Sequence, residues 1–523
     1  MDQMKRRILC IAVMVTLILS ALAVRVYSIQ VIQGPVYEVM ARSQQRIALS
    51  GVDRRGTICD RYGEPLTGAK LEYVYILRRD RMTGEVEELL NDVKARERRT
   101  SNSKYRIFTT GAYKKESSEK LRREHGAYIL QIPQRYEEDQ TAVYLLGYVR
   151  SADQVGMTGL EAAYDEYLSQ RDKVIFGVAD AANRILPGYG VQNTEEREVR
   201  LITTLDKKLQ EKVEDIVDRV DEGRTCAIIT DVKTGDILVS ATSPGFDPFL
   251  VEELLQSENE ELLDIALKGM YPPGSVFKVV VALAALEEGI VSQETTFTCD
   301  GAEEFGNDGD VVIGCTAKEG HGTLTLEEAF AHSCNCAFIQ MGRAVGAEQI
   351  LDMAQRLGFG RDVLKGLDME HRGNLPEMEE TVGAGIANLS IGQGSLLVTP
   401  IQVAQMIQIV ASGGLDTGLW LTNLEPRQES RRVISEPVAA EMLNMMRAVT
   451  EYGTAKRISD WDCGGKTGSA EGFLDGTPAV HAWFTGVVPA NDPQFTVTVF
   501  VEGGGSGGRA AVPVFEQILN VLE

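Results

Sequence analysis

Histidine and cysteine, the usual zinc ligands, are few in this chain of 523 residues, and they form no recognisable pattern. The five histidines are scattered, and the eight cysteines include no Cys-x-x-Cys pair. Zinc sites with a sequence signature usually contain such a pair or a group of histidines. We therefore expect no metal ion and no cofactor. Cys299 and Cys315 lie at the two ends of a short segment and could form a disulfide outside the cytoplasm.

An excess of basic residues is also missing. The chain has 53 Lys and Arg against 76 Asp and Glu, which gives a net charge of −23. Such a balance argues against nucleic-acid binding. One stretch, Lys94–Arg123, is locally basic. It could contact an anionic polymer or lipid headgroups, but we favour a solvated loop.

Long apolar runs are absent with one exception, Ile8–Val24. At about 1.5 Å per residue this run barely spans a hydrocarbon core of about 30 Å, and Val26–Ile32 can extend it. Lys5–Arg7 precede the run, which predicts an N-terminus in the cytoplasm. Ala21–Ala23 resembles a cleavage site, so a signal peptide is the alternative. We favour an uncleaved anchor, because the helical pattern continues beyond that point.

Three short motifs follow one another at wide spacing: Ser275-x-x-Lys278, Ser333-x-Asn335 and Lys466-Thr467-Gly468. Together they are typical of enzymes that transfer an acyl group through a serine ester. Each motif is weak evidence alone, because the chain contains further copies. These copies begin at Ser101, Ser117, Ser257 and Lys233. We interpret the first three as solvated surface, and the last as a hairpin turn between two β-rich runs.

Ser275 stands at the start of an apolar run, Val276–Leu286, in which Lys278 is the polar exception. Such a run predicts a buried helix. Lys278 lies three residues after the serine, so its amine reaches the same face. Burial favours a neutral amine that can take the serine proton. The structural alternative is a helix N-cap with a snorkelling lysine, which the other two motifs disfavour.

Ser333 and Asn335 follow a helix that begins with a capping box of Thr325 and Glu328. Polar residues between apolar neighbours need hydrogen-bond partners when they are buried. We interpret Ser333 as a proton shuttle and Asn335 as an anchor for a substrate amide. The alternative is a junction between helices that uses both residues for capping. His332 is tempting as a base, but we expect it to pack.

Lys466 opens an edge strand along which a peptide substrate can lie. Gly468 lacks a side chain, so the substrate backbone can approach. The N–H groups of Ser275 and Ser469 would hold an oxyanion. The hydroxyls of Thr467 and Ser469, with the charge of Lys466, would hold a substrate carboxylate.

The predicted fold class is α+β, with a single transmembrane helix, an elongated mixed pedestal and a sheet domain. We expect a stub at 1–7, an anchor at 8–27, a pedestal at 28–205 and the sheet domain at 206–523. A helical insertion at 252–459 should carry Ser275 and Ser333, and a C-terminal helix should pack on a five-stranded antiparallel sheet. The five predicted strands are Cys226–Val232, Ile237–Thr242, Gly464–Ala470, His481–Val488 and Gln494–Glu502.

From about Arg25 to its end, the sequence resembles class B penicillin-binding proteins, the monofunctional peptidoglycan D,D-transpeptidases of the penicillin-binding protein 2/3 type. Besides the three motifs, four blocks carry the resemblance: Arg55–Gly63, Gly159–Glu161, Leu205–Gln210 and Ser390–Gly394 with the following Thr399-Pro400. The pedestal contains no glycosyltransferase-like block, which favours class B over the bifunctional class A. The family more often has threonine at the position of Ser469. The resemblance implies a penicillin-binding/serine β-lactamase-like transpeptidase domain.

The resemblance also implies a reaction and its partners. Ser275 would attack the D-Ala-D-Ala end of a peptidoglycan stem peptide and pass the acyl group to an amine of a neighbouring stem. β-Lactams would acylate Ser275 and remain bound. The protein would be a single-pass membrane protein with an extracytoplasmic catalytic domain. It would serve wall synthesis in division, elongation or sporulation, with a SEDS-type glycosyltransferase and other wall-synthesis membrane proteins as partners.

Four alternatives stay open at this point. A D,D-carboxypeptidase or a β-lactamase would keep the fold and use water as the acceptor, although no base for water is evident. A membrane-bound β-lactam sensor is less favoured, because no cytoplasmic signalling domain precedes the anchor. A scaffold without activity is disfavoured, because all catalytic residues are present.

Overall fold

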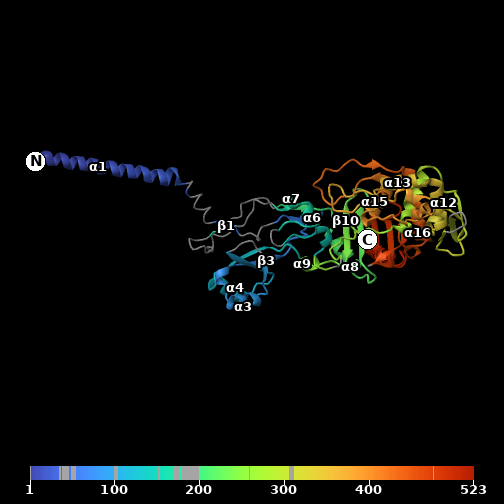
Figure 1. Ribbon diagram of the computed structural model, residues 1–523, viewed down its shortest axis with the longest axis horizontal. Helices are drawn as coiled ribbons and strands as arrows, with labels where there is room; N and C mark the ends of the chain where they lie inside the picture. Colours follow the sequence, from blue (N-terminus) through green and yellow to red (C-terminus); the bar gives the residue numbers. More distant parts are fainter. Residues whose placement is uncertain are drawn as a thin grey trace.

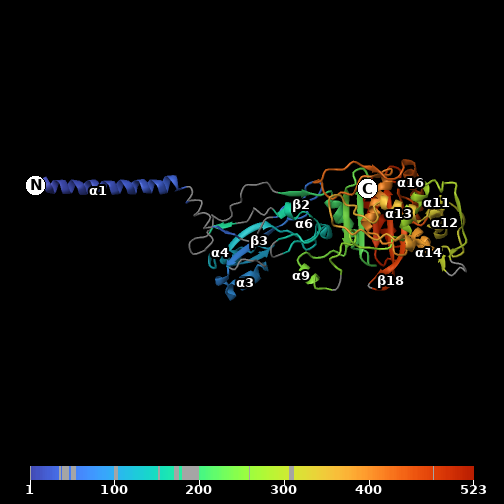
Figure 2. The ribbon, with the colours of Figure 1, turned by 45° about the horizontal axis from the view of Figure 1, so that its top comes forward.

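The molecule is elongated, with an isolated helix at one end, a small mixed unit in the middle and a large domain at the other end (Figure 1). A second view shows the same order along the long axis (Figure 2). The computed structural model describes residues 2–34, 37, 46–48, 55–98, 104–150, 154–169, 176–178, 199–257, 260–305, 311–474 and 476–523.

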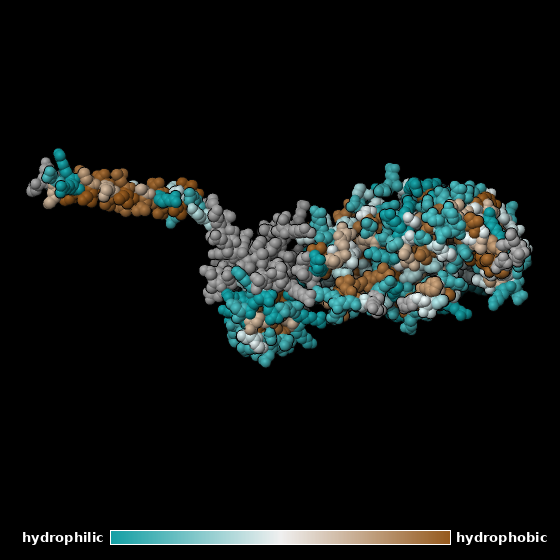
Figure 3. Space-filling model, in the orientation of Figure 1, coloured by the Kyte–Doolittle hydropathy of each residue, from teal (hydrophilic) through white to brown (hydrophobic). Residues whose placement is uncertain are grey.

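The N-terminal helix α1 (Asp2–Tyr27) continues into a π-helical turn, η1 (Ser28–Ile32). Its apolar side chains are exposed along its length and appear brown in Figure 3. Among the described residues, Gln3–Ile32 is the one helix long and apolar enough to cross a membrane. At about 1.5 Å per residue its 30 residues exceed a hydrocarbon core of about 30 Å. The prediction that the helix continues beyond Val24 is confirmed.

A four-stranded antiparallel sheet with the order β4-β5-β3-β6 forms the core of the middle unit. The strands are β3 (Leu71–Arg78), β4 (Arg96–Arg98), β5 (Tyr105–Thr110) and β6 (Tyr128–Pro133). Two helices, α3 (Gly84–Asp92) and α4 (Lys115–Arg123), share one apolar cluster with this sheet. Their contact closes a small core that is separate from the core of the large domain.

The basic stretch at 94–123 is not a solvated loop, as far as its residues are described. It contributes β4, β5 and α4, in which Ile107 and Leu121 are buried. The loop prediction was wrong because the few apolar residues of the stretch are spaced so that they share buried faces. Its cations also have acidic partners: Arg106 pairs with Glu97, Lys114 with Asp92, and Lys120 with Glu85.

Short elements connect the middle unit to the large domain. Strand β2 (Thr57–Cys59) pairs in parallel with β8 (Arg200–Ile202), which joins two segments far apart in the sequence. A second pair, β1 (Arg46–Ala48) with β7 (Phe176–Val178), lies on the side of the middle unit nearer the N-terminal helix (Figure 1). The remaining connecting elements are α5 (Val143–Leu146), α6 (Gly159–Ala163) and α7 (Asp165–Ser169).

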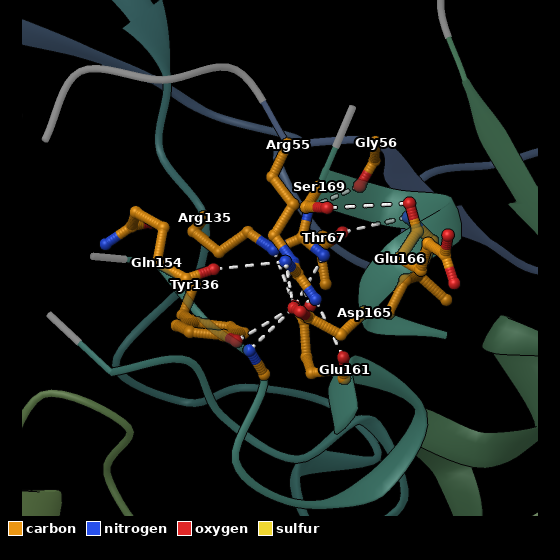
Figure 4. Close-up of polar contacts among 12 residues, drawn as sticks. Arg55, Gly56, Thr67, Arg135, Tyr136, Gln154, Glu161, Asp165, Glu166 and Ser169 are labelled. Atoms are coloured by element: carbon orange, nitrogen blue, oxygen red, sulfur yellow. Dashed lines mark hydrogen bonds and ion pairs between the residues drawn. The ribbon is translucent and has the colours of Figure 1, made fainter. Parts of the chain in front are cut away.

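A buried charge cluster around Glu161 holds these connecting segments together (Figure 4). Oε1 of Glu161 accepts hydrogen bonds from Arg135 Nε at 2.6 Å and from the Tyr136 hydroxyl at 2.9 Å. Oε2 pairs with Arg55 Nε at 2.5 Å, and Arg55 Nη1 also reaches Asp165 Oδ1 at 2.7 Å. The Glu161 carboxylate on α6 therefore joins the segment around Arg55 to the chain after β6, and Arg55 in turn binds α7 through Asp165.

We expect Glu161→Ala to destabilise the connecting region by about 3–5 kcal/mol, because it leaves buried guanidinium groups without their partner. The side chain of Arg55 is only 4% exposed, and that of Arg135 is 11% exposed. Hydrogen exchange of the amides at 56–59 and 158–168, in the full-length protein in detergent, measures the local opening free energy.

Glu166→Ala, at an exposed position of the adjacent helix α7, is the matched control for this variant. It should change the opening free energy by less than about 0.5 kcal/mol. Indistinguishable exchange in the two variants would show that the charge cluster does not hold the region.

The large domain contains a five-stranded antiparallel sheet with the order β10-β9-β19-β18-β17. All five predicted strands are confirmed, and β17 lies at the edge. The strands are β9 (Thr225–Asp231), β10 (Ile237–Ser243), β17 (Gly464–Leu474), β18 (Thr477–Val488) and β19 (Phe495–Val501). Helices α8 (Lys207–Val217) and α17 (Ala511–Leu522) pack on the sheet. The ring of Phe515 on α17 meets that of Phe484 at 4.5 Å, so the predicted packing of the C-terminal helix is confirmed.

The insertion between β10 and β17 is mostly helical, as predicted, but it also contains three short antiparallel strand pairs. Its helices are α9 (Val251–Leu254), η3 (Gly274–Phe277), α10 (Lys278–Glu287), α11 (Leu326–Ala331), α12 (Asn335–Val345), α13 (Ala347–Arg356), η4 (Met378–Thr381), α14 (Ala384–Ser390), α15 (Pro400–Ala411), α16 (Glu436–Glu451) and η5 (Lys456–Ile458). The pairs are β11 (Thr296–Cys299) with β14 (Gly322–Thr325), β12 (Ala302–Phe305) with β13 (Val311–Gly314), and β15 (Leu415–Asp416) with β16 (Arg431–Arg432). A further helix in the chain, η2 (Arg79–Arg81), lies in the middle unit.

Candidate active site

Ser275 lies in the 3-10 turn η3, which leads directly into helix α10. We predicted the first turn of an α-helix here, and the structure has the tighter turn instead. Gly274 makes the turn possible, because its φ is +54° and a Cβ there would lie 2.7 Å from the Ser469 carbonyl oxygen. The turn therefore docks against the edge strand β17 and leaves Ser275 partly exposed.

Lys278 is fully buried at the start of α10. Its Nζ donates to the Ser333 carbonyl oxygen at 2.7 Å, to Ser333 Oγ at 3.2 Å and to Asn335 Oδ1 at 2.7 Å. Burial disfavours the ammonium and lowers the pKa of Lys278 to about 8. The three donors of an ammonium are thus all used, while a neutral amine would have a lone pair available for a proton.

Ser333 lies in the junction between α11 and α12, after the predicted capping box of Thr325 and Glu328, which the structure confirms. Its φ of +54° is uncommon for a residue with a side chain. This backbone aims the hydroxyl at two amines: Oγ accepts from Lys278 Nζ at 3.2 Å and from Lys466 Nζ at 3.0 Å. The hydroxyl proton of Ser333 stays available for donation.

Asn335 is the first residue of α12 and is half-buried beside Ser333. Its Oδ1 accepts from Lys278, and its Nδ2 donates to the Gly314 carbonyl oxygen at 2.9 Å. The side-chain amide is therefore fixed between Lys278 at the start of α10 and Gly314 at the end of β13.

Lys466 projects from β17 into the interior and is fully buried. Burial and the nearby Lys278 lower the pKa of Lys466 well below its usual value. Its Nζ donates to Ser333 Oγ and to the Thr467 carbonyl oxygen at 3.1 Å. Because its Nζ is buried and already has these two partners, we expect Lys466 to act on Ser333 and not to contact a substrate carboxylate directly.

The neighbours of Lys466 occupy the edge of the sheet. Ser469 is exposed, and its Oγ accepts from the Gly507 N–H at 3.2 Å. Thr467 is nearly buried, and its hydroxyl shares a 2.6 Å hydrogen bond with that of the exposed Thr454. Sequence reasoning did not include Thr454 and Gly507, because they lie outside the three motifs and reach β17 only through the fold.

Gly468 lies in β17 and leaves room for the turn that carries Ser275. A Cβ at this position would lie 2.8 Å from Val276 Cγ2 and 3.1 Å from the Pro273 carbonyl oxygen. Those atoms belong to the turn that carries Ser275, so the missing side chain lets this turn approach β17. This is a different reason from the substrate approach that we predicted.

The further copies of the motifs lie away from this site, as far as they are described. Ser117 is in α4, where its Oγ bonds Asp92 Oδ2 at 2.6 Å, so it is nearly buried rather than solvated. Lys233 lies in the hairpin turn between β9 and β10, as predicted. Ser257 is exposed as predicted, while Ser101 and Asn259 fall outside the described residues.

His332 packs against other rings, as predicted. Its ring stacks on that of His321 at 6.0 Å and lies 5.9 Å from that of Tyr452.

Known proteins are similar to this chain over most of its length. Residues 225–520 match the family described as the penicillin binding protein transpeptidase domain. Peptidoglycan D,D-transpeptidase PbpA of Mycolicibacterium smegmatis is 31% identical over 427 residues, a match that covers 73% of this chain and 81% of that protein. Penicillin-binding protein PbpB of the same organism is 26% identical, and the match covers 70% of this chain and 61% of that protein.

A solved structure shows the same fold. Penicillin binding protein 3 of Mycobacterium tuberculosis, in complex with aztreonam, superposes with a TM-score of 0.65 at 22% identity. The superposition covers 90% of this chain and 95% of that one. The α+β architecture of sheet domain and pedestal is therefore shared.

Proposed function

The chain belongs to the penicillin-binding protein transpeptidase family, and from this premise we propose that it cross-links peptidoglycan stem peptides through an acyl-enzyme on Ser275. The observation that carries the proposal is the Ser333 hydroxyl, which accepts hydrogen bonds from both Lys278 and Lys466 beside the serine turn. Such a chain of donors and acceptors can carry a proton from a nucleophile to a leaving group.

Acylation begins when the neutral amine of Lys278 takes the proton of Ser275 Oγ. The serine oxygen attacks the carbonyl carbon of the penultimate D-Ala, and a tetrahedral intermediate forms. The N–H groups of Ser275 and Ser469 hold its oxyanion. The bond to the terminal D-Ala then breaks, and its amine receives the Ser333 hydroxyl proton while Lys278 returns a proton to Ser333.

Deacylation repeats these steps in reverse order with a new amine. The acceptor amine of a neighbouring stem attacks the ester carbonyl, and its proton passes to Ser333 and Lys278. The ester bond breaks, Ser275 recovers its proton, and a cross-linking amide remains. β-Lactams would enter the first half of this sequence, because they present a strained amide in place of the D-Ala-D-Ala bond.

The terminal carboxylate of the donor stem would lie against the hydroxyls of Thr467 and Ser469 on β17. Asn335 would bind the amide of the substrate from the opposite side. Lys466 takes a different role from the one its motif indicated: its Nζ donates to Ser333 Oγ and orients that hydroxyl.

The nature of the acceptor separates a transpeptidase from a hydrolase on the same fold. The full-length enzyme in detergent, given pentapeptide-bearing glycan strands and an acceptor amine, should release D-Ala and form mostly the new amide. Mass spectrometry of the peptide products measures this ratio. A product pool dominated by free tetrapeptide would instead identify a carboxypeptidase.

The membrane arrangement is the second part of the proposal. The cluster Lys5–Arg7 would keep the N-terminus in the cytoplasm, α1 would span the bilayer, and the domain at 206–523 would stand outside on the pedestal at 28–205. Protease added to spheroplasts should then remove the catalytic domain but leave an N-terminal epitope.

A SEDS-type glycosyltransferase would bind α1 and the pedestal. A photo-reactive residue at the exposed position Leu17 should cross-link to a polytopic protein, and capture of lipid alone would oppose that partner.

A further inference from the structure

A buried carboxylate behind the turn of Ser275 has no part in the mechanism above. Glu502 follows the last residue of β19 and is only 3% exposed. Its Oε1 accepts from the Tyr271 hydroxyl at 3.0 Å and from Arg224 Nη2 at 3.0 Å, and its Oε2 accepts from Arg224 Nε at 2.7 Å. A buried carboxylate needs such partners, so these three side chains form one unit.

The direction of the hydrogen bond between Tyr271 and Glu502 follows from its surroundings. Burial and the Glu502 carboxylate raise the pKa of Tyr271 far above its ordinary value. The hydroxyl therefore keeps its proton and donates to the carboxylate. Arg224 supplies the opposite charge through two parallel hydrogen bonds, which is a strong geometry for a guanidinium and a carboxylate.

Tyr271 is also held by its ring and its backbone. The centre of its ring lies 4.2 Å from that of Phe500 on β19. Its N–H donates to the Val398 carbonyl oxygen at 2.9 Å, and its carbonyl oxygen accepts from the Val398 N–H at 2.9 Å. The next residue is held too, because Trp483 Nε1 on β18 donates to the Pro272 carbonyl oxygen at 3.1 Å. The chain that leads to Ser275 is thereby fixed to β18 and β19.

Only the sequence Pro272-Pro273-Gly274 separates Tyr271 from Ser275. Each proline ring fixes φ at about −65°, so this segment has little freedom. The N–H of Gly274 donates to the Gly392 carbonyl oxygen at 2.9 Å, which restrains the glycine as well. A shift of Tyr271 should therefore move Ser275 and not be absorbed by the chain between them.

We propose that Glu502 is a positioning residue for the nucleophile: it holds Tyr271 and thereby sets how the turn of Ser275 docks on β17. This role rests on the proposed acyl transfer, in which the N–H groups of Ser275 and Ser469 bind the oxyanion. Those two groups belong to different segments, so their separation depends on the docking of the turn. A misplacement of about 1 Å can lower the rate of a catalysed step by about 10²-fold.

Tyr271→Phe tests this role, because it removes the hydroxyl but keeps the ring on Phe500 and the carboxylate with Arg224. Stopped-flow acylation of the full-length protein in detergent, at increasing concentrations of a chromogenic β-lactam, yields a dissociation constant and an acylation rate constant. The rate constant should fall about 10–100-fold, while the dissociation constant stays within about twofold. The increase of the rate up to about pH 8 should persist, because Lys278 is unchanged.

Tyr75→Phe is the matched control. Tyr75 is also a buried tyrosine, but its hydroxyl shares a 2.6 Å hydrogen bond with Ser118 in the middle unit. This variant should keep both constants of the wild type.

Glu502→Gln separates positioning from stability. Glutamine keeps an oxygen that can accept from the Tyr271 hydroxyl, but it loses the charge that pairs with Arg224. This variant should lower the midpoint of thermal unfolding and keep the acylation rate constant within about threefold of the wild type. Tyr271→Phe should show the opposite pattern, with a slower acylation and a smaller change of the midpoint. A contribution to stability alone would not produce this reversal.

Two outcomes would overturn the positioning role. One is an acylation rate constant of Tyr271→Phe within about twofold of that of Tyr75→Phe. The other is a loss confined to the dissociation constant, which would place Tyr271 in substrate binding. Acylation by a β-lactam precedes the use of an acceptor, so both readouts are the same for a transpeptidase and a hydrolase.

Failure of this role and failure of the proposed function give different results. A wild type that is acylated as expected, together with an unaffected Tyr271→Phe variant, would refute the positioning role and leave the acyl-enzyme in place. A folded wild type that is not acylated at all would refute the proposed function, and the positioning role with it.

Discussion

Replacing Ser275 by alanine should abolish covalent labelling by a fluorescent penicillin and lower D-Ala release by about 10⁴-fold or more. The expected loss is large because the ester forms on Ser275, while the neighbouring hydroxyls of Ser333, Thr467 and Ser469 already have hydrogen-bond partners. The Ser333 hydroxyl oxygen accepts hydrogen bonds from the amines of Lys278 and Lys466, so we assign Ser333 as the proton carrier and not as a second nucleophile. Gel fluorescence after a fixed labelling time measures the first quantity, and D-Ala assays measure the second.

The chain offers its own control for this variant. Ser117 begins another Ser-x-x-Lys sequence, but its hydroxyl bonds Asp92 in the pedestal. Ser117→Ala should therefore label like wild type. Retained labelling in folded Ser275→Ala protein would refute the assignment of the nucleophile. A wild-type band that forms and disappears within minutes would indicate rapid hydrolysis and thus a β-lactamase.

As the pH is raised, the acylation rate should increase about tenfold per pH unit up to about pH 8 and then level off. Burial lowers the pKa of Lys278 to about 8. Only the neutral amine can accept the serine proton, and below the pKa the neutral fraction falls tenfold for each pH unit. Higher pH therefore increases the competent fraction until the amine is fully neutral. Stopped-flow acylation by a chromogenic β-lactam over pH 6–9.5 measures this profile.

Lys278→Ala should lower the acylation rate by about 10²–10⁴-fold and remove the rise toward pH 8. Lys233→Ala is the matched control, because Lys233 belongs to the second Lys-Thr-Gly copy, in the hairpin turn between β9 and β10. It should keep both the rate and the profile. An unchanged pH profile in Lys278→Ala would assign the titration to another group and would exclude Lys278 as the base.

Several features of this protein follow from its sequence alone. Alternating or continuous apolar runs are local signals, and they identified all five strands of the sheet. The Thr325–Glu328 capping box and the helix after Ser275 are local as well. The order of the three motifs indicated acyl transfer through a serine ester, because each motif uses residue types that the chemistry requires, and four further blocks indicated the family.

The tertiary structure decided how those residues act. The sequence cannot show that Lys466 is buried against Ser333, because that contact joins an edge strand to a junction 133 residues away. Nor does it show that Gly468 makes room for the turn of Ser275, since the distance depends on how the insertion docks on the sheet. The basic stretch at 94–123 is a similar case: most of its residues are charged, and the few apolar residues of its buried face are not recognisable from the sequence.

The cluster of Cys299, Cys315, His321 and Cys334 shows most clearly what the sequence determines and what only the tertiary structure determines. No two of these residues stand at the short spacing by which such a cluster is recognised in a sequence, so the sequence did not predict that they meet. Three chain segments, folded back by the short strand pairs, bring their side chains to one point. Local periodicity determines which elements form, whereas convergence of distant side chains depends on how those elements pack.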